Sequence, residues 1–219
     1  MKIAIDGTAA SGKGTLARSL AKELGYDYLD TGLLYRSIAL NARDHGIIDS
    51  DISAENSVIA NSKIKKLTDI ALLLTFPLLD QPELRGQEVS LLAAKIANLP
   101  EIRNILLEKQ RLFANKPTSG VGVVLDGRDI GTVILPDAEF KFFIDAKPEI
   151  RAKRRYAELR KSDKRVLEKS VLDEINKRDA EDWTRQIAPL KRLPSAFFID
   201  SSSLNADEVL QIALNYING

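Results

Sequence analysis

Residues 2–15 read KIAIDGTAASGKGT. This stretch opens with an apolar run typical of a buried strand, followed by glycines and Lys13 in the spacing G-x-x-x-x-G-K. Thr15–Leu24 then has helical character and stops at Gly25. A strand, a glycine-rich loop and a helix in this order predict a phosphate-binding loop, because loop amides and a helix N-terminus attract anions.

The loop itself departs from the common pattern at one position. Gly14 stands directly after Lys13, where such loops usually carry Ser or Thr, and Thr15 comes one residue later. A Mg²⁺ ion could therefore be bound by Thr15, or mainly by phosphates and water, which Mg²⁺ tolerates. The loop residues are the candidates for binding the phosphates: Gly7, Thr8, Ala9, Ala10, Ser11, Gly12, Lys13, Gly14 and Thr15.

Short apolar runs that end in Asp recur along the chain. The five runs are Lys2–Ile5, Tyr26–Leu29, Val121–Leu125, Phe140–Ile144 and Ala196–Ile199. Segments with helical character separate them, and this alternation predicts an α/β fold with a parallel sheet covered by helices. Ligands gather at the carboxyl ends of such strands, which is where the Asp residues fall.

The remaining segments indicate one domain with two excursions, near residues 46–115 and 148–190. Helices are expected over Tyr35–His45, Glu83–Asn98 and Glu101–Asn115, and residues 151–190 are charged and mostly helical. His45 precedes Gly46, so we expect it to cap a helix. The apolar, partly alternating segment Ile64–Leu79 is interpreted as a strand or hairpin interrupted by Pro77.

Composition limits the classes of function. The 219 residues carry a formal net charge of +1, so any anion site must be local. The absence of cysteine excludes disulfides and cysteine-ligated zinc. The sequence shows no signal-peptide pattern and no apolar run as long as a membrane span. We expect a cytoplasmic protein that binds neither membrane nor nucleic acid.

Arginines follow two of the expected strands. DTGLLYR places Thr31, Tyr35 and Arg36 after one strand, and LDGRDIG places Arg128 and Asp129 after another. Arginines can bind a second phosphate bidentately, although each could also be a surface ion-pair partner. Asp126, at the same strand end, is a candidate for ordering water around Mg²⁺, or else a strand-end cap or a partner of Arg128.

Two charged helices allow both a functional and a structural interpretation. In KRDAEDWTR, Arg178, Asp182 and Arg185 fall on one helix face, either as a site or as an exposed ion-pair ladder. The basic residues at 151 and 153–155 crowd another helix, which could close over phosphates or remain solvated. Basic residues at 151–165 could also bind nucleic acid, but no aromatic residues are interleaved there in support. Trp183 is expected to pack locally.

With these residues in place, the chain resembles the bacterial cytidylate kinases, a branch of the nucleoside monophosphate kinases. The resemblance runs nearly end to end, through the motifs IDGTAASGKGT, YLDTGLLYRSIAL, ELRGQEVSLLAAKIANLPEIRNILLEKQR, VLDGRDIGTVILPDA and KRDAEDWTRQIAPL. It implies a P-loop kinase fold with a five-stranded parallel core (1–45, 116–147, 191–219), a nucleoside-monophosphate-binding excursion (46–115) and a lid (148–190). It also implies phosphorylation of CMP and dCMP by ATP with Mg²⁺, by a protein expected to be a monomer.

The resemblance also implies roles for individual residues. The loop from Gly7 to Thr15 would bind ATP. The acceptor nucleotide would be bound by Thr31, Tyr35, Arg36, Arg103, Arg128, Asp129, Arg178 and Asp182. Lys13, Arg128, Arg178 and Arg185 would be catalytic. Ala94 stands where family members often place a serine near the base, and water or Ser90 could replace that contact.

Other functions stay open at this level. A kinase for UMP, another nucleotide or a non-nucleotide acceptor would use a similar loop. A regulatory switch that hydrolyses ATP or GTP slowly would also use it, but would leave a second arginine site without a purpose. An enzyme that phosphorylates a phosphate monoester needs no general base, because the acceptor oxygen is already anionic.

Overall fold

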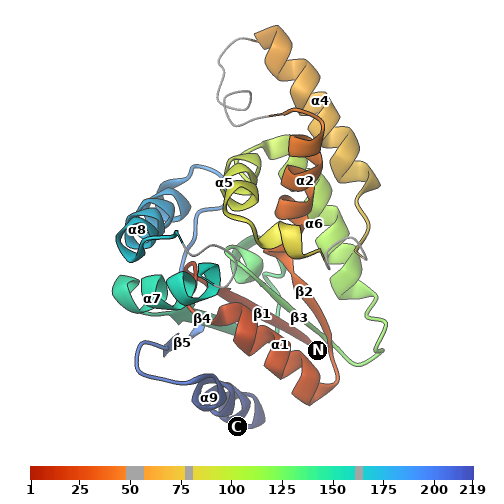
Figure 1. Ribbon diagram of the computed structural model, residues 1–219. Coiled ribbons are helices and arrows are strands. Elements are labelled where there is room, and N and C mark those ends of the chain that lie inside the picture. The colour runs from red at the N-terminus through yellow and green to blue at the C-terminus, as the bar shows by residue number, and fades with distance from the viewer. Residues whose placement is uncertain (48–56, 77–80, 161–164) are drawn as a thin grey trace. The chain divides into compact units, whose positions relative to one another are not determined.

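The computed structural model describes residues 1–47, 57–76, 81–160 and 165–219. It divides into two compact units, a sheet unit (Met1–Leu29 and Ala114–Gly219) and a helical unit (Asp30–Phe113). In chain order the elements are β1 (Lys2–Gly7), α1 (Lys13–Leu24), β2 (Asp27–Asp30), α2 (Thr31–Asp44), α4 (Ser57–Leu73), η2 (Pro82–Arg85), α5 (Gln87–Ile96), α6 (Pro100–Asn115), β3 (Val123–Gly127), η3 (Ile130–Ile134), β4 (Phe140–Asp145), α7 (Pro148–Leu159), α8 (Glu168–Thr184), β5 (Phe197–Asp200) and α9 (Ala206–Asn218) (Figure 1).

The five predicted strands form one sheet in the order β2-β3-β1-β4-β5, which confirms the predicted α/β fold. β1 pairs in parallel with β3 and with β4, and β4 pairs in parallel with β5. Helices α1 and α9 pack on this sheet through a shared apolar core (Figure 1). That core is buried and consists of Ile3, Ile5, Leu16, Ala17, Leu20, Ala21, Val124, Phe142, Ile144, Ile199, Val209 and Ala213. The chain leaves β1 at the middle of the sheet, where α/β folds bind ligands.

The register brings the carboxyl ends of the central strands to one edge. Asp6 lies opposite Gly127, and Gly7 lies opposite Ile144. A Cβ atom at Gly7 would overlap the carbonyl oxygen of Ile144. Glycine is therefore required where β1 passes into the phosphate-binding loop.

Gly7→Ala is expected to lower the free energy of unfolding by about 3 kcal/mol or more, because the atom in the way is backbone that cannot rotate aside. Urea unfolding measures this loss. Gly14→Ala is the matched control, because a Cβ at Gly14 makes only ordinary contacts of 3.6 Å and longer. An equal effect of the two changes would contradict the close approach of β1 to β4.

The helical unit corrects one prediction. The sequence predicts a strand or hairpin over Ile64–Leu79, but α4 is a helix to Leu73, and residues 77–79 lie outside the described part of the chain. Leu67 and Ala71 are buried one turn apart, whereas Leu72 and Leu73 are exposed. The apolar residues therefore cover more than one helix face, which made the pattern resemble a strand.

The other helices begin close to the predicted positions. α2 starts four residues before the predicted Tyr35, because Asp30 caps it by accepting a 3.0 Å hydrogen bond from the Gly32 amide. Extended backbone at Gly86 divides the predicted helix Glu83–Asn98 into η2 and α5. His45 caps α2 as expected, and its Nδ1 lies 2.8 Å from the Asn41 carbonyl.

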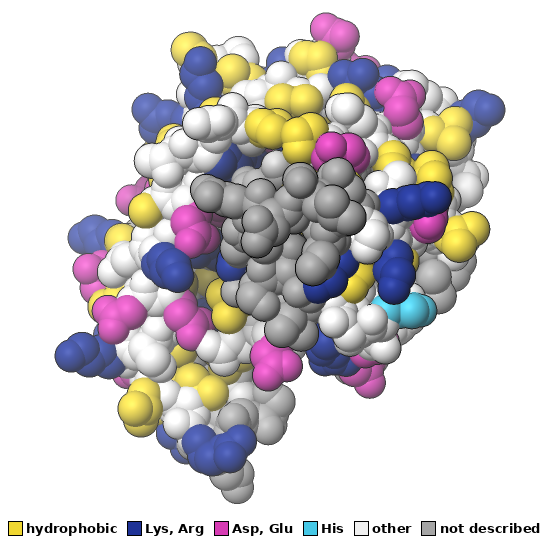
Figure 2. Space-filling view, turned by 90° about the horizontal axis from the view of Figure 1, so that it is seen from above, with side chains coloured by type: hydrophobic (Ala, Val, Ile, Leu, Met, Phe, Trp, Pro, Cys, Tyr) yellow, Lys and Arg dark blue, Asp and Glu magenta, His cyan; other side chains and the backbone are white. Residues whose placement is uncertain are grey.

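Acidic and basic side chains are interspersed on the face of the molecule shown in Figure 2, in line with the formal net charge of +1. None of the helices in the described part of the chain has the length and apolar composition that a membrane span requires.

Candidate active site

The phosphate-binding loop connects the end of β1 to the start of α1, as its sequence predicts. Gly12, which caps α1, has φ +92°, and Ala10 has φ +58°, so two residues of the loop are left-handed. The first turn of α1 carries no acidic residue, so the partial positive charge at the helix N-terminus is not offset there. Lys13 lies in that turn and donates from Nζ to the Thr8 carbonyl at 3.2 Å. The N-terminus of a helix and an ammonium group are thus present at the loop where a phosphate is expected.

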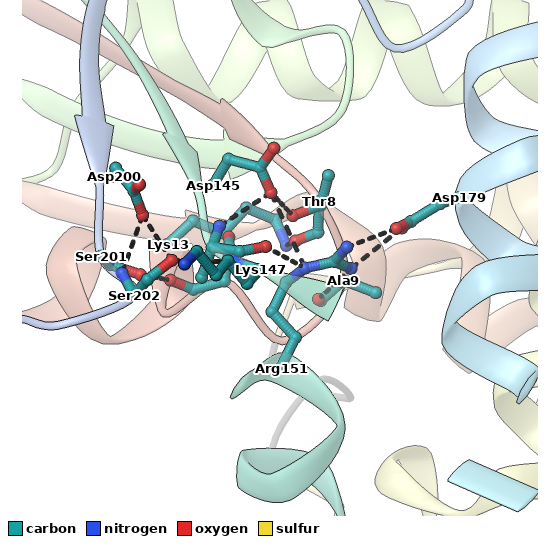
Figure 3. Close-up of polar contacts among 12 residues, drawn as sticks. Thr8, Ala9, Lys13, Asp145, Lys147, Arg151, Asp179, Asp200, Ser201 and Ser202 are labelled. Carbon is teal, nitrogen blue, oxygen red and sulfur yellow. Dashed lines mark hydrogen bonds and ion pairs between the residues drawn. The ribbon is translucent and has the colours of Figure 1, made fainter. Parts of the chain in front are cut away.

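Side chains from β4 and from the segment after β5 hold this loop (Figure 3). Thr8 donates from its hydroxyl to Asp145 Oδ1 at 2.6 Å, at the end of β4. Ser201, just beyond β5, donates from its hydroxyl to the Ser11 carbonyl at 2.8 Å. Both contacts join residues more than 130 positions apart, so the shape of the loop depends on the packed sheet as well as on its own glycines.

Asp126 is buried at the end of β3 and is held by a residue of β2. Tyr28 donates to Asp126 Oδ1 at 2.8 Å. A Cβ at Gly14 would lie 3.6 Å from Asp126 Oδ2, so this carboxylate faces the start of α1. Thr15 lies in the first turn of α1 and is exposed.

The groups around Asp126 suit Mg²⁺ that is held mostly by phosphates and water. The described residues contain no cluster of three or more His, Cys, Asp or Glu side chains that could hold a metal by themselves. Mg²⁺ commonly keeps several waters and takes one or two carboxylates beside substrate phosphates. One carboxylate beside a phosphate-binding loop fits that pattern.

Asp182 on α8 brings two separately predicted arginine groups together. Arg128 Nε, from the turn after β3, lies 2.7 Å from Asp182 Oδ2. The two arginines of the same helix face are farther away, with Arg178 Nε at 4.0 Å and Arg185 Nη1 at 3.7 Å. The ion-pair ladder expected on α8 is therefore present, but its central carboxylate is buried and makes its shortest contact with Arg128.

The pKa values of this cluster reflect mutual stabilisation of charge. Burial alone would raise the pKa of Asp182, but the guanidiniums of Arg128, Arg178 and Arg185 hold it below its usual range. Burial would likewise lower the pKa of Arg128, but the carboxylates of Asp182, Asp126 and Asp179 together raise it above its usual range. Three guanidiniums within 4.0 Å of one carboxylate concentrate cationic groups at a position suited to an anionic substrate.

Asp6, to which the sequence analysis assigned no role, supports the turn that carries Arg128 and Asp129. Its two carboxylate oxygens accept the backbone amides of Ile130 and Gly131 at 2.7 and 2.8 Å. Burial raises the pKa of Asp6 from 3.8 to about 6, although these two amides partly oppose the shift. The sequence feature that could have indicated a role for Asp6 is its position at the end of β1, one residue before the loop.

Asp6 is expected to make stability fall as pH rises. The folded chain holds the Asp6 proton more tightly than the unfolded chain, so ionisation between about pH 4 and pH 6 favours unfolding. Because one pKa unit corresponds to about 1.4 kcal/mol, the full cost above pH 6 is about 3 kcal/mol.

Urea unfolding of Asp6→Asn and of the unchanged chain at several pH values measures this contribution. The stability of the variant relative to the unchanged chain should increase by up to about 3 kcal/mol between pH 4 and pH 7.5. Asp173→Asn, at an exposed position of α8, should give a difference that is independent of pH. A constant difference for Asp6→Asn would show that this carboxyl group does not have a raised pKa.

The helical unit places Thr31, Tyr35 and Arg36 on α2. Thr31 is buried in the first turn, and Arg36 donates from Nη1 to the Leu84 carbonyl at 3.3 Å. Arg103 of α6 lies with its guanidinium 6.0 Å from the centre of the Tyr35 ring. It also donates from Nη1 to the Ala97 carbonyl at 3.0 Å. Two residues predicted to contact the acceptor, far apart in sequence, are thus neighbours in this unit.

Two further expectations can be compared with the structure. Ser90, considered as a replacement for a serine at Ala94, donates its hydroxyl to the Gly86 carbonyl at 2.8 Å. Trp183 was expected to pack locally, but it packs against Phe143 of β4, with the two ring centres 6.0 Å apart. The hydrogen bond that Ser90 donates to Gly86, four residues earlier, therefore occupies the Ser90 hydroxyl in this structure.

The basic cluster of α7 is not a row of solvated side chains. Arg151 is buried and paired with Asp179, and Arg154 donates to the hydroxyl and carbonyl of Ser201 at 3.0 and 2.6 Å. Arg155 pairs with Glu158 at 3.1 Å. The crowding predicted from the sequence is therefore relieved by contacts within the sheet unit.

Comparison with known proteins agrees with this geometry. A family model described as cytidylate kinase matches residues 3–219. A cytidylate kinase of Paramagnetospirillum magneticum is 42% identical over 215 residues, covering 98% of this chain and 96% of the relative. One of Methylocella silvestris is 44% identical over 214 residues, covering 98% and 92%.

Solved structures bear on the fold alone. The crystal structure of a shikimate kinase from Bacteroides thetaiotaomicron has a TM-score of 0.51 at 11% identity, and the match covers 100% of this chain and 99% of that one.

Proposed function

Because the chain belongs to the cytidylate kinase family, we propose that it transfers the γ-phosphoryl group of ATP to CMP and dCMP, forming ADP with CDP or dCDP. The observation that carries this proposal is the match of the family model over residues 3–219. A phosphate-binding loop and an arginine cluster at the ends of neighbouring strands support it. We further propose that the protein acts as a monomer in the cytoplasm.

The reaction requires compensation of the negative charge on the phosphates more than it requires proton transfer. An anionic oxygen of the CMP phosphate forms a bond to the γ-phosphorus, while the bond from that phosphorus to the β-γ bridging oxygen breaks and ADP leaves. Lys13 and the N-terminus of α1 offset the negative charge of the donor phosphates. Mg²⁺, when bound, adds further positive charge on these phosphates, with Asp126 and Thr15 as the groups proposed to serve it.

The remaining site residues are proposed to bind the acceptor. We assign the acceptor phosphate to Arg36 and Arg128, beside Thr31 and Tyr35. We assign the base to Arg103 and Asp129, the ribose hydroxyls to Arg178 and Asp182, and the transferred phosphate to Arg185. The contact of Arg128 with Asp182 supports a common site for the acceptor phosphate and the ribose hydroxyls, because one ion pair holds the two side chains assigned to them. We propose that residues 46–115 bind the nucleoside monophosphate and that residues 148–190 form a lid.

An acceptor panel tests the proposal. Purified protein with ATP and Mg²⁺ is assayed for ADP release with CMP, dCMP, UMP, AMP, GMP or no acceptor. Fast release with CMP and dCMP and slower release with UMP are expected. Equal rates with CMP and UMP would support phosphoryl transfer to a nucleotide, but would show that Ala94 relaxes the selection of cytosine over uracil. Release that does not depend on an acceptor would contradict the kinase and favour a nucleotide-hydrolysing switch.

A further inference from the structure

Arg151 on α7 has a buried guanidinium that joins three segments of the sheet unit (Figure 3). Its side chain is only 3% exposed. Nε donates to the Ala146 carbonyl at 2.7 Å, and Nη1 donates to the Ala9 carbonyl at 3.2 Å. Both terminal nitrogens also donate to Asp179 on α8, at 3.1 and 2.5 Å. One side chain thus connects the phosphate-binding loop, the end of β4 and helix α8.

The contact with the loop falls at its most constrained point. Ala9 is followed by Ala10, whose φ of +58° is one that residues with a side chain rarely adopt. Such a conformation persists where the surroundings hold it in place, and it is often found at ligand-binding loops. Around Ala10, Arg151 binds the Ala9 carbonyl and Ser201 binds the Ser11 carbonyl. Holding the carbonyl oxygen of a peptide also fixes the direction of its amide. The two contacts therefore help to orient the loop amides that we expect to bind a phosphate.

The contact with α8 ties the loop to the helix that carries the acceptor-binding candidates. Asp179 follows Arg178 directly and lies three residues before Asp182. Asp179 binds the Arg151 guanidinium through both oxygens, which fixes the orientation of the fork as well as compensating its charge.

We propose that Arg151 is a positioning residue that holds the Ala9–Ala10 turn in its phosphate-binding shape, and that Asp179 holds Arg151 in turn. The proposal rests on the proposed ATP-binding function of the loop. A direct contact of Arg151 with ATP is the alternative, and it fits the geometry poorly. The guanidinium is buried, bound through both oxygens of one carboxylate and engaged with two carbonyls, so reaching a nucleotide would require breaking four hydrogen bonds.

The two roles predict different results for Asp179. If Arg151 positions the loop, Asp179→Asn loosens the guanidinium and weakens ATP binding. If Arg151 contacts ATP, Asp179→Asn releases the arginine for the nucleotide, so ATP binding is unchanged or tighter. Arg151→Lys weakens binding under both roles, because a lysine cannot reproduce the fork.

The experiment measures the dissociation constant of β,γ-imido-ATP with Mg²⁺ by calorimetry, together with the melting temperature of each variant. Arg151→Lys is expected to raise the dissociation constant about tenfold, the usual effect of losing one charge-assisted hydrogen bond. Asp179→Asn is expected to raise it about threefold or more. Adding Ala10→Gly to Arg151→Lys should recover much of the loss, because glycine adopts the left-handed conformation without a steric cost.

An exposed arginine–aspartate pair provides the matched control. Arg43 and Asp44 on α2 form a 3.1 Å ion pair with side chains 44% and 57% exposed. Arg43→Lys and Asp44→Asn should leave the dissociation constant within about twofold, as expected for a surface pair.

Three outcomes would overturn the proposal. The first is unchanged or tighter binding of the ATP analogue by Asp179→Asn. The second is no recovery of binding when Ala10→Gly is added to Arg151→Lys, and the third is a lower melting temperature of Arg151→Lys with an unchanged dissociation constant. Should Arg151→Lys not fold, Asp179→Asn alone decides. If the unchanged chain binds the analogue but does not phosphorylate CMP, the proposed reaction fails while this proposal still stands.

Discussion

Lys13→Ala is expected to abolish detectable transfer of phosphate to CMP, a loss of roughly 10²–10³-fold or more in kcat. Lys13 is the cationic side chain in the first turn of α1, with its ammonium group 3.2 Å from the Thr8 carbonyl. Charge that develops on the transferred phosphoryl group is stabilised by donors already fixed in place, so alanine removes a contribution that water does not replace. A coupled assay of ADP release at saturating ATP and CMP measures the effect.

The control for this change is Lys22→Ala. Lys22 lies on the same helix, in its last turn, and is exposed. Its removal should leave kcat within about twofold, because an exposed charge far from the loop acts weakly. If Lys13→Ala retained more than a tenth of the original kcat with an unchanged melting temperature, the assignment of the loop to the donor phosphates would be wrong.

Asp182→Ala is expected to lower kcat/KM for CMP by roughly 10²-fold while leaving the affinity for an ATP analogue largely unchanged. Asp182 lies within 4.0 Å of three guanidiniums, and its loss leaves the half-buried Arg128 without its closest carboxylate. Arg178→Ala should impair turnover with CMP in the same direction. Initial rates across a range of CMP concentrations, together with calorimetry of β,γ-imido-ATP, separate the two effects.

Removing a buried ion-pair partner also costs stability, about 3–5 kcal/mol. Turnover must therefore be measured well below the melting temperature of the variant, and Arg178→Ala, which removes a more exposed partner, gives an independent reading. Asp173→Ala, at an exposed position of α8, should change neither turnover nor ATP affinity. Unchanged kcat/KM for CMP in both Asp182→Ala and Arg178→Ala would show that this face of α8 is an ion-pair ladder only.

Asp6 and Asp182 make opposite contributions to the pH dependence of stability. The pKa of Asp182 is held below its ordinary value, so its contribution to stability is present above about pH 4 and is lost as pH falls through its folded-state pKa. The pKa of Asp6 is raised, so its ionisation lowers stability as pH rises toward 6. Both carboxylates are buried, and the difference comes from their partners, which are arginines for Asp182 and backbone amides for Asp6.

Local patterns in the sequence were sufficient for much of the fold and for the donor loop. The strands, α1 and the G-x-x-x-x-G-K loop depend on apolar runs, glycine positions and caps that lie within a few residues of one another. The segment 64–79 misled for a related reason. When apolar residues cover several faces of a helix, as at Leu72 and Leu73 of α4, periodicity no longer separates helix from strand.

The residue types that end each strand, and the arginines that follow them, can be identified from the sequence. The partners of these residues depend on tertiary packing. The pairs Arg128–Asp182 and Arg151–Asp179 and the contacts of Asp6 with the turn after Asp129 join positions 28 to 125 residues apart. Which charges meet across such separations depends on how helices pack on the sheet, and no short-range pattern encodes it. Burial then determines how strongly each pair interacts, because an ion pair removed from water holds its geometry, whereas the interaction of an exposed pair is screened by solvent and salt.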